Sequence, residues 1–114
     1  MTGFYSPVDM NDVVNVVKGG STVPLKFNVY NCNNMEITST SYILGQSAQV
    51  AEYTCGGSTE VPLEEVVNTG ATSLRYDGNQ FIQNWKTPST KNKCYVVRVT
   101  TIDGSYIQAL FKTK

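Results

Sequence analysis

Residues 19–30 of the chain read Gly19-Gly20-Ser21-Thr22-Val23-Pro24-Leu25-Lys26-Phe27-Asn28-Val29-Tyr30. Two glycines break the chain, and apolar side chains then occupy every second position from Val23 to Val29. Alternation of this kind is typical of a strand with one face in a core and the other face in water. The segment therefore predicts a strand that runs to about Tyr30 and whose apolar face seeds the core.

The composition of the 114-residue chain fits one domain with a modest core. Val, Thr, Tyr, Ser and Asn are frequent, and these residues are favoured on pleated sheets and in turns. Nine basic residues balance nine acidic ones, and no basic stripe runs along the sequence, so we expect no nucleic-acid partner. The apolar runs are too short to span a bilayer, and Met1 does not begin a signal peptide, so we expect no membrane insertion.

The rest of the chain divides into short apolar segments separated by turn-forming residues. We expect strands at residues 13–17, 22–30, 36–43, 47–53, 73–76, 81–85, 94–101 and 105–111. Residues 61–67 could form one helical turn, but Pro62 and the β-branched residues favour a ragged strand. Asp77-Gly78-Asn79 and Asp103-Gly104 predict two hairpins.

This pattern predicts an all-β fold. Seven to eight short antiparallel strands, regular turns and no convincing helix are typical of a two-sheet immunoglobulin-like β-sandwich. We expect residues 1–12 to be an irregular lead-in packed on the domain, and residues 13–114 to form the domain. Six side chains of the closing hairpin should face one interior: Tyr95, Val97, Val99, Ile107, Ala109 and Phe111. We expect Trp85 to be partly buried, with its indole N–H bonded at the sheet edge.

The three cysteines point to a disulfide. Cys55 lies in a Gly-rich turn and Cys94 opens the penultimate strand; a bridge between them closes a loop of about 40 residues and stabilises by about 4 kcal/mol in the chain-entropy model. Cys32 is then left over. A zinc site or a nucleophilic cysteine is the alternative, but the spacing lacks CxxC and no histidine is present. We therefore expect an oxidising location, extracellular or at the cell surface.

The acidic residues give little support to an enzyme. Four acids are expected in loops, where turn chemistry explains them better than calcium binding does: Asp9, Asp12, Asp77 and Asp103. Glu64 and Glu65 are adjacent, so on a strand they point to opposite faces and do not act together as acid and base. Histidine, the commonest general base, is absent. We expect no catalytic residue, cofactor or metal site.

Two further features admit a binding role beside a structural one. Five tyrosines could face outward and stack on sugars, although tyrosine is also a good strand residue: Tyr30, Tyr42, Tyr53, Tyr76 and Tyr106. Lys26 is out of phase with Leu25 and Phe27, on a strand that Pro24 prevents from pairing fully on both sides. We expect Lys26 to be structural, either on a solvated face or in a contact that fixes strand register.

The segment Pro24-Leu25-Lys26-Phe27 resembles the signature of the PxKF family, which is named for Pro-x-Lys-Phe. Other motifs follow the family order and cover nearly the whole chain: Gly3-Phe4-Tyr5-x-Pro7-Val8-Asp9, Gly20–Phe27, Trp85-Lys86-Thr87-Pro88, Cys94-Tyr95, and Asp103-Gly104-Ser105 followed by Ala109-x-Phe111. Each motif alone is common. The ordered set is specific.

The resemblance implies an immunoglobulin-like module of a secreted or surface-exposed multidomain bacterial protein, with no known activity. Members commonly have cysteines that match Cys55 and Cys94, and Cys32 lies outside the pattern. The resemblance also implies that Met1 begins a domain taken from a longer exported chain. We expect a non-catalytic spacer, stability cap or adhesion domain whose partners are other domains of the parent chain, a cell-surface protein or a glycan. Carbohydrate binding through the surface tyrosines is the alternative function.

Overall fold

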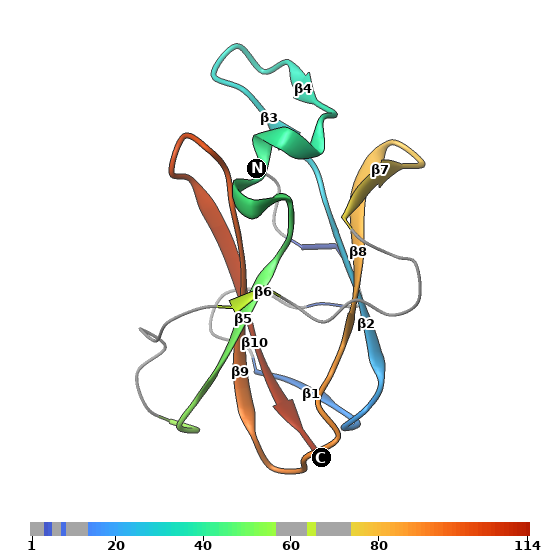
Figure 1. Cartoon of the computed structure of the whole chain (residues 1–114), viewed down its shortest axis with the longest axis vertical. Helices are drawn as coiled ribbons and strands as arrows, with labels where there is room; N and C mark the ends of the chain where they lie inside the picture. Colours follow the sequence, from blue (N-terminus) through green and yellow to red (C-terminus); the bar gives the residue numbers. More distant parts are fainter. Residues whose placement is uncertain (1–3, 6–7, 9–13, 57–63, 66–73) are drawn as a thin grey trace.

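The computed structural model describes residues 4–5, 8, 14–56, 64–65 and 74–114, which form a β-sandwich (Figure 1). Within these ranges no helix has the length and hydrophobicity needed to cross a membrane. The strands are β1 Val14–Val17, β2 Thr22–Phe27, β3 Val29–Tyr30, β4 Glu36–Ile37, β5 Gln49–Tyr53, β6 Glu64–Glu65, β7 Arg75–Asp77, β8 Gln80–Lys86, β9 Cys94–Thr100 and β10 Tyr106–Thr113. Two 3-10 helices, η1 Thr40–Tyr42 and η2 Leu44–Gln46, precede β5.

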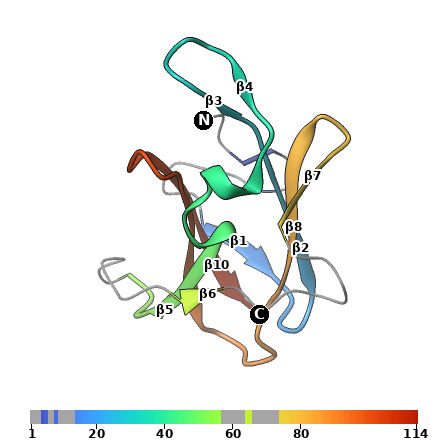
Figure 2. The ribbon, with the colours of Figure 1, turned by 45° about the horizontal axis from the view of Figure 1, so that its top comes forward.

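Two main sheets face each other and confirm the predicted all-β sandwich. One sheet has the order β1-β10-β9-β5-β6 and the other the order β2-β8-β7, while β3 pairs with β4 in a small separate sheet. Figure 2 shows β1 lying beside β10. This pair is parallel, whereas the sequence predicts antiparallel strands. The reason is that β1 and β2 belong to different sheets, so β1 forms no hairpin with β2 and aligns with the final strand instead.

The core lies between the two sheets and follows the predicted alternation. On β2, Val23, Leu25 and Phe27 are buried while the residues between them are not. Phe27 stacks on Phe81 of β8 with ring centroids 5.4 Å apart. The six closing-hairpin residues expected to face one interior all belong to or pack against this core: Tyr95, Val97, Val99, Ile107, Ala109 and Phe111. The strands β2, β8 and β10 therefore bury alternate residues, as the period-two pattern predicts.

Trp85 is buried more deeply than the sequence suggests. It is 1% exposed and lies on β8, the central strand of its sheet, and not at an edge. Its ring packs edge-on against Tyr95 of β9 and Phe111 of β10, with centroid distances of 6.1 and 5.0 Å. The position before a loop suggested an edge, but the facing strands supply an aromatic pocket that covers the indole.

The predicted strand over residues 22–30 is divided at Asn28. Its side chain accepts a hydrogen bond from the Tyr5 hydroxyl at 2.6 Å and donates one to the Asn79 carbonyl at 2.9 Å. Beyond this point Val29 and Tyr30 leave the second sheet and pair with β4. The side-chain hydrogen bonds of Asn28 thus compete with continuation of the strand.

The strand predicted over residues 36–43 is wrong beyond Ile37. Residues 40–42 and 44–46 form the two 3-10 helices, and Ile43 between them is extended and bridges to Thr101. The Ser39 hydroxyl accepts a hydrogen bond from the Ser41 N–H at the start of η1. Gly45 adopts a φ of 72°, which favours glycine. Local hydrogen bonding by Ser side chains offers the backbone an alternative to a sheet, which explains the difference. The neighbouring prediction over residues 47–53 is confirmed by β5.

The two predicted hairpins are confirmed where they are described. Arg75 pairs with Ile82 across the turn at residues 78–79, and β9 pairs antiparallel with β10. Of residues 61–67, the structure describes Glu64 and Glu65, which form β6 against β5. The other residues of that segment, and Val13 and Ser73, lie outside the described ranges.

Truncation of Trp85 should show that the aromatic contact between the sheets carries much of the stability. We expect Trp85→Ala to lower the free energy of unfolding by about 3–5 kcal/mol, because it leaves a large cavity between the sheets. Urea denaturation at equilibrium measures the change. The control Met35→Ala, at a side chain that is 64% exposed, should change stability by less than about 0.5 kcal/mol. Equal effects of the two substitutions would contradict a central role for Trp85.

Candidate functional site

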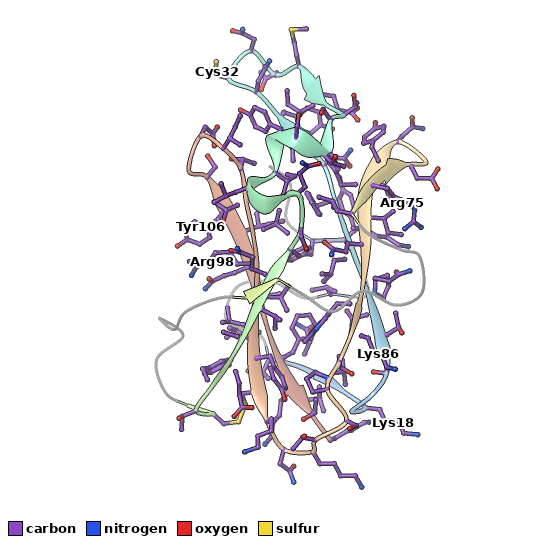
Figure 3. All side chains as sticks on the ribbon, viewed as in Figure 1. Lys18, Cys32, Arg75, Lys86, Arg98 and Tyr106 are labelled. Carbon is purple, nitrogen blue, oxygen red and sulfur yellow. A yellow bond between two sulfur atoms is a disulfide. The ribbon has the colours of Figure 1, made fainter. Side chains whose placement is uncertain are left out.

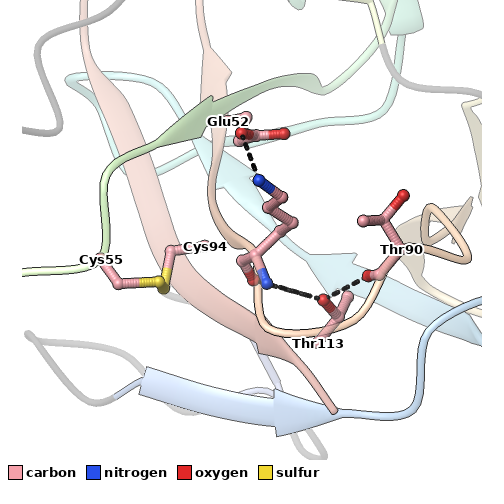
Figure 4. The surroundings of a disulfide bond; sticks show 6 residues. Glu52, Cys55, Thr90, Cys94 and Thr113 are labelled. Carbon is pink, nitrogen blue, oxygen red and sulfur yellow. Dashed lines mark hydrogen bonds and ion pairs between the residues drawn. A yellow bond between two sulfur atoms is a disulfide. The ribbon is translucent and has the colours of Figure 1, made fainter.

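The structure contains the predicted disulfide between Cys55 and Cys94, with Cα atoms 5.3 Å apart. It joins the turn after β5 to the first residue of β9 (Figure 4). The strands β5 and β9 already pair with each other. Next to it, Lys93 lies 3.9 Å from Glu52 and its N–H donates to the Thr113 hydroxyl at 3.1 Å. The bridge therefore lies at one end of the sandwich and outside the main core.

The positions that face each other inside the sandwich are apolar. Leu25, Phe27 and Val97, where a disulfide between the sheets would be expected in an immunoglobulin-like domain, are fully buried. Cys32 is an exposed free thiol in the turn between β3 and β4, and Figure 3 shows it at the end of the molecule opposite Lys18 and Lys86. The structure thus separates the leftover cysteine from the bonded pair.

The signature residues of the opening segment take part in the fold. Phe27 lies in the core, and Pro24 lies on β2, an edge strand of its sheet, which fits the pairing limit that proline imposes. The Lys26 carbonyl accepts a hydrogen bond from the Tyr5 N–H at 2.9 Å, which ties the lead-in to β2. Among the described residues, no ion pair or hydrogen bond to the half-buried Lys26 side chain is present.

The turn at residues 18–21 docks against residues 87–89. The Gly20 N–H donates to the Pro88 carbonyl at 3.0 Å. A Cβ atom on Gly19 would lie 3.0 Å from the Ser89 carbonyl oxygen, so this close approach favours glycine. The Gly-Gly-Ser and Trp-Lys-Thr-Pro motifs, which are far apart in the sequence, therefore meet in space as one structural unit.

Asp103 organises the turn between β9 and β10. Its carboxylate accepts hydrogen bonds from the Thr101 hydroxyl, from the Ser105 N–H at 3.0 Å and from the Tyr42 hydroxyl at 3.3 Å. The first two lower the pKa of Asp103 to about 2. This arrangement is the turn chemistry that the sequence predicts.

The other acids do not assemble into a described centre. Asp77 lies 3.9 Å from Arg75 in a hairpin, and Glu64 and Glu65 are neighbours on β6. Asp9 and Asp12 lie outside the described residues. Among the residues that the structure describes, no three acids or cysteines gather closely enough to hold a metal ion.

Three of the five candidate tyrosines are engaged in the fold. Tyr53 is buried, the Tyr42 hydroxyl bonds to Asp103, and the Tyr76 hydroxyl bonds to Glu36. The bond to Glu36 raises the pKa of Tyr76 to about 12. It also joins β4 to β7.

The two remaining tyrosines are exposed. Tyr30 is 43% exposed and Tyr106 is 54% exposed. The Arg98 guanidinium lies 4.4 Å from the centre of the Tyr106 ring and also bonds to Gln108 (Figure 3). A sugar platform would therefore rest on these two residues.

Sequence reasoning missed a concentration of lysines at one end of the sandwich. Six of the nine basic residues lie on the turn before β2, at the end of β8, in the loop after it and at the end of β10: Lys18, Lys86, Lys91, Lys93, Lys112 and Lys114. These lysines form no continuous stripe in the sequence because they come from three separate segments of the chain. A usable signal was that most of them flank predicted turns, which a sandwich collects at its ends.

Comparison of the chain with models of protein families, with curated proteins and with solved structures found no match. Membership of the PxKF family therefore stays a prediction that rests on the sequence motifs. The structure adds the positions that the motif residues take in the fold.

Thiol counting tests the disulfide. We expect one free thiol per chain under denaturing conditions without reductant and three after reduction, because Cys55 and Cys94 are bonded and Cys32 is exposed. Reduction should lower the free energy of unfolding by about 2–4 kcal/mol. The control Cys32→Ser should titrate no free thiol and keep the melting temperature. Three free thiols before reduction would contradict the bridge.

The low pKa of Asp103 makes part of the stability depend on pH. Its pKa falls from 3.8 to about 2 on folding, so its contribution is present above pH 3.8 and is lost as the pH falls through about 2. Asp103→Asn should therefore lower the melting temperature at pH 6, and the difference from the wild-type chain should shrink between pH 4 and pH 2. Thermal melting followed by circular dichroism measures this. A difference that is constant with pH would contradict the assignment.

Proposed function

We propose that the chain is a non-catalytic immunoglobulin-like module of the PxKF type, acting as a spacer or interaction domain in a secreted or surface-exposed bacterial protein. The observation that carries this proposal is where the chain enters and leaves the sandwich. Phe4 packs against Phe27 at the far end of β2, whereas the Lys114 N–H bonds to the Val17 carbonyl beside the turn before β2. Neighbouring domains would therefore attach toward opposite ends of the 41 Å long axis (Figure 1).

The motif residues support a structural reading of the family signature. Trp85 and Phe27 fill the core, and residues 18–21 and 87–89 lock together at the end of the sandwich. Each of these residues packs in the core or takes part in a close approach between segments. The proposed module thus uses its signature for folding, which fits a role in spacing or capping.

The disulfide supports an exported location. A bridge between Cys55 and Cys94 persists in oxidising compartments and is reduced in most bacterial cytoplasms. It links segments that are 39 residues apart and stabilises the folded module. Spacer domains on a cell surface need this resistance to unfolding.

Carbohydrate binding remains the second candidate because Tyr30 and Tyr106 are exposed aromatic side chains. A titration of neutral glycans followed by nuclear magnetic resonance discriminates between the two roles. Shifts confined to residues around either tyrosine, and abolished by Tyr30→Ala or Tyr106→Ala, would favour the binding module.

A tandem fusion tests the spacer role. We expect two copies joined from Lys114 to Met1 by a short linker to form an extended rod, because Phe4 and Lys114 lie toward opposite ends of the long axis. Small-angle X-ray scattering should give a maximum dimension of about twice the 41 Å axis of one copy. A circularly permuted pair, with the joint moved to the turn at residues 78–79, is the control. Compact particles from the direct fusion would contradict the proposal.

A further inference from the structure

A hairpin projects from one end of the sandwich and presents an apolar side chain at its tip. Strands β3 and β4 pair with each other and belong to neither main sheet. Figures 1 and 2 show this hairpin extending beyond the turns at the same end of the main sheets. Met35, in its turn, is 64% exposed, the largest exposed fraction among the large hydrophobic side chains that the structure describes. Methionine is enriched at protein interfaces, so Met35 is a candidate anchor for a partner.

Hydrogen bonds inside the hairpin fix the position of Met35. The Asn31 side-chain oxygen accepts from the Asn33 N–H at 2.9 Å and from the Met35 N–H at 3.0 Å. The Asn31 N–H donates to the Met35 carbonyl at 2.9 Å and closes the turn. Below the tip, the Tyr76 hydroxyl bonds to Glu36 and joins the hairpin to β7. A tip that is held in this way loses little conformational entropy when it docks.

A groove of matching chemistry lies between β1 and β2, toward the other end of the molecule. It has a volume of about 520 Å³, and its lining includes Val14, Val16, Lys18 and Lys114. The two valines are 41% and 57% exposed. Figure 3 shows Lys18 at the end of the molecule opposite Cys32, which belongs to the turn of the hairpin. The groove therefore offers exposed apolar side chains beside two lysines.

From these two features we propose that the hairpin tip of one copy docks into the β1–β2 groove of a second copy of this chain. The Met35 side chain packs against Val14 and Val16 of the other copy. The carboxylate of Glu36, the next residue, brings a negative charge toward the two lysines. The contact uses side chains and needs no unpaired strand edge.

Charge and shape favour a second copy as the occupant of the groove. Between Lys26 and Arg75 the sequence contains no basic residue, so the hairpin brings no positive charge to the groove. The groove is lined by Lys18 and Lys114, and complementary charge of this kind selects partners and their orientation. A methionine side chain is unbranched and flexible, which lets it fill an irregular apolar groove.

The contact is head-to-tail because two different surfaces meet, and contacts of this type build rings or open chains. Phe4 packs against Phe27 at the hairpin end of β2, whereas the Lys114 N–H bonds to Val17 at the groove end. Copies joined in tandem would therefore follow the same polarity, with the groove end of one before the hairpin end of the next. The contact goes beyond the spacer role proposed above and does not depend on it.

Sedimentation velocity of the Cys32→Ser chain tests the proposal, because this background excludes covalent dimers through the exposed thiol. We expect the sedimentation coefficient to rise between about 10 µM and about 1 mM, the range of a small, weak interface. Met35→Lys and Val16→Asp should each weaken association at least about tenfold, because each places a charge where the opposing surface repels it. The matched control Ile102→Lys, at a side chain that is 61% exposed in the turn between β9 and β10, should change affinity less than about twofold.

A mixture of the two variants distinguishes a head-to-tail contact from a symmetric one. The Met35→Lys chain keeps an intact groove and the Val16→Asp chain keeps an intact tip. An equimolar mixture should therefore form dimers at concentrations where neither variant associates alone. Thermal melting followed by circular dichroism establishes that each variant is folded. Lys18→Glu/Lys114→Glu is a second groove variant, and the Met35→Lys chain should rescue its association in the same way.

Three outcomes would overturn the proposal. The first is a Cys32→Ser chain that stays monomeric at about 1 mM. The second is an Ile102→Lys variant that associates as weakly as Met35→Lys. The third is a mixture of Met35→Lys and Val16→Asp that stays monomeric, as a symmetric contact between two hairpin tips requires. The scattering of the tandem fusion is a separate measurement, so the spacer role and this contact can fail separately.

Discussion

Contact of Trp85 with the opposite sheet is the interaction on which the sandwich depends. No strand pairing joins the two main sheets among the described residues, so side chains must hold them together. Trp85 meets Tyr95 and Phe111 across the interface, and burial of an aromatic ring of this size contributes several kcal/mol. A second link is polar, because the buried Gln83 side chain accepts from the Ala48 N–H at 2.8 Å. This hydrogen bond fixes the position of β8 relative to the segment before β5.

Because side-chain packing holds the two sheets together, the disulfide is not needed between them and lies within one sheet. Cys55, in the turn after β5, is bonded to Cys94, the first residue of β9, near the end of the sheet in which β5 and β9 pair. A disulfide at this place constrains the unfolded chain without determining how the sheets pack. The interlocked turn at residues 18–21 closes the same end. Stability at this end therefore comes from backbone hydrogen bonds and a bridge, and stability in the middle comes from aromatic contacts.

The features that could be predicted from the sequence are those with local signals. Alternation in β2, Asp-Gly turns and the closing hairpin depend on neighbours in the chain, and all were recovered. The depth of Trp85, the division of the strand at Asn28 and the parallel pairing of β1 depend on segments that are far apart. No local pattern contains that information. The 3-10 helices over residues 40–46 were missed for a different reason, since Ser side chains can serve a sheet surface and a tight turn equally well.

The same limit applies with more force to binding surfaces. Lys18 and Lys114 are almost a chain length apart, yet the hydrogen bond from the Gly19 N–H to the Lys114 carbonyl places them side by side. The absence of a Cβ on Gly19 lets this turn lie close to residues 88–89. One glycine thus serves both roles: it lets the turn dock, and the docked turn brings together charges that the sequence disperses. A motif that specifies folding can in this way bring together charged residues that are far apart in the sequence.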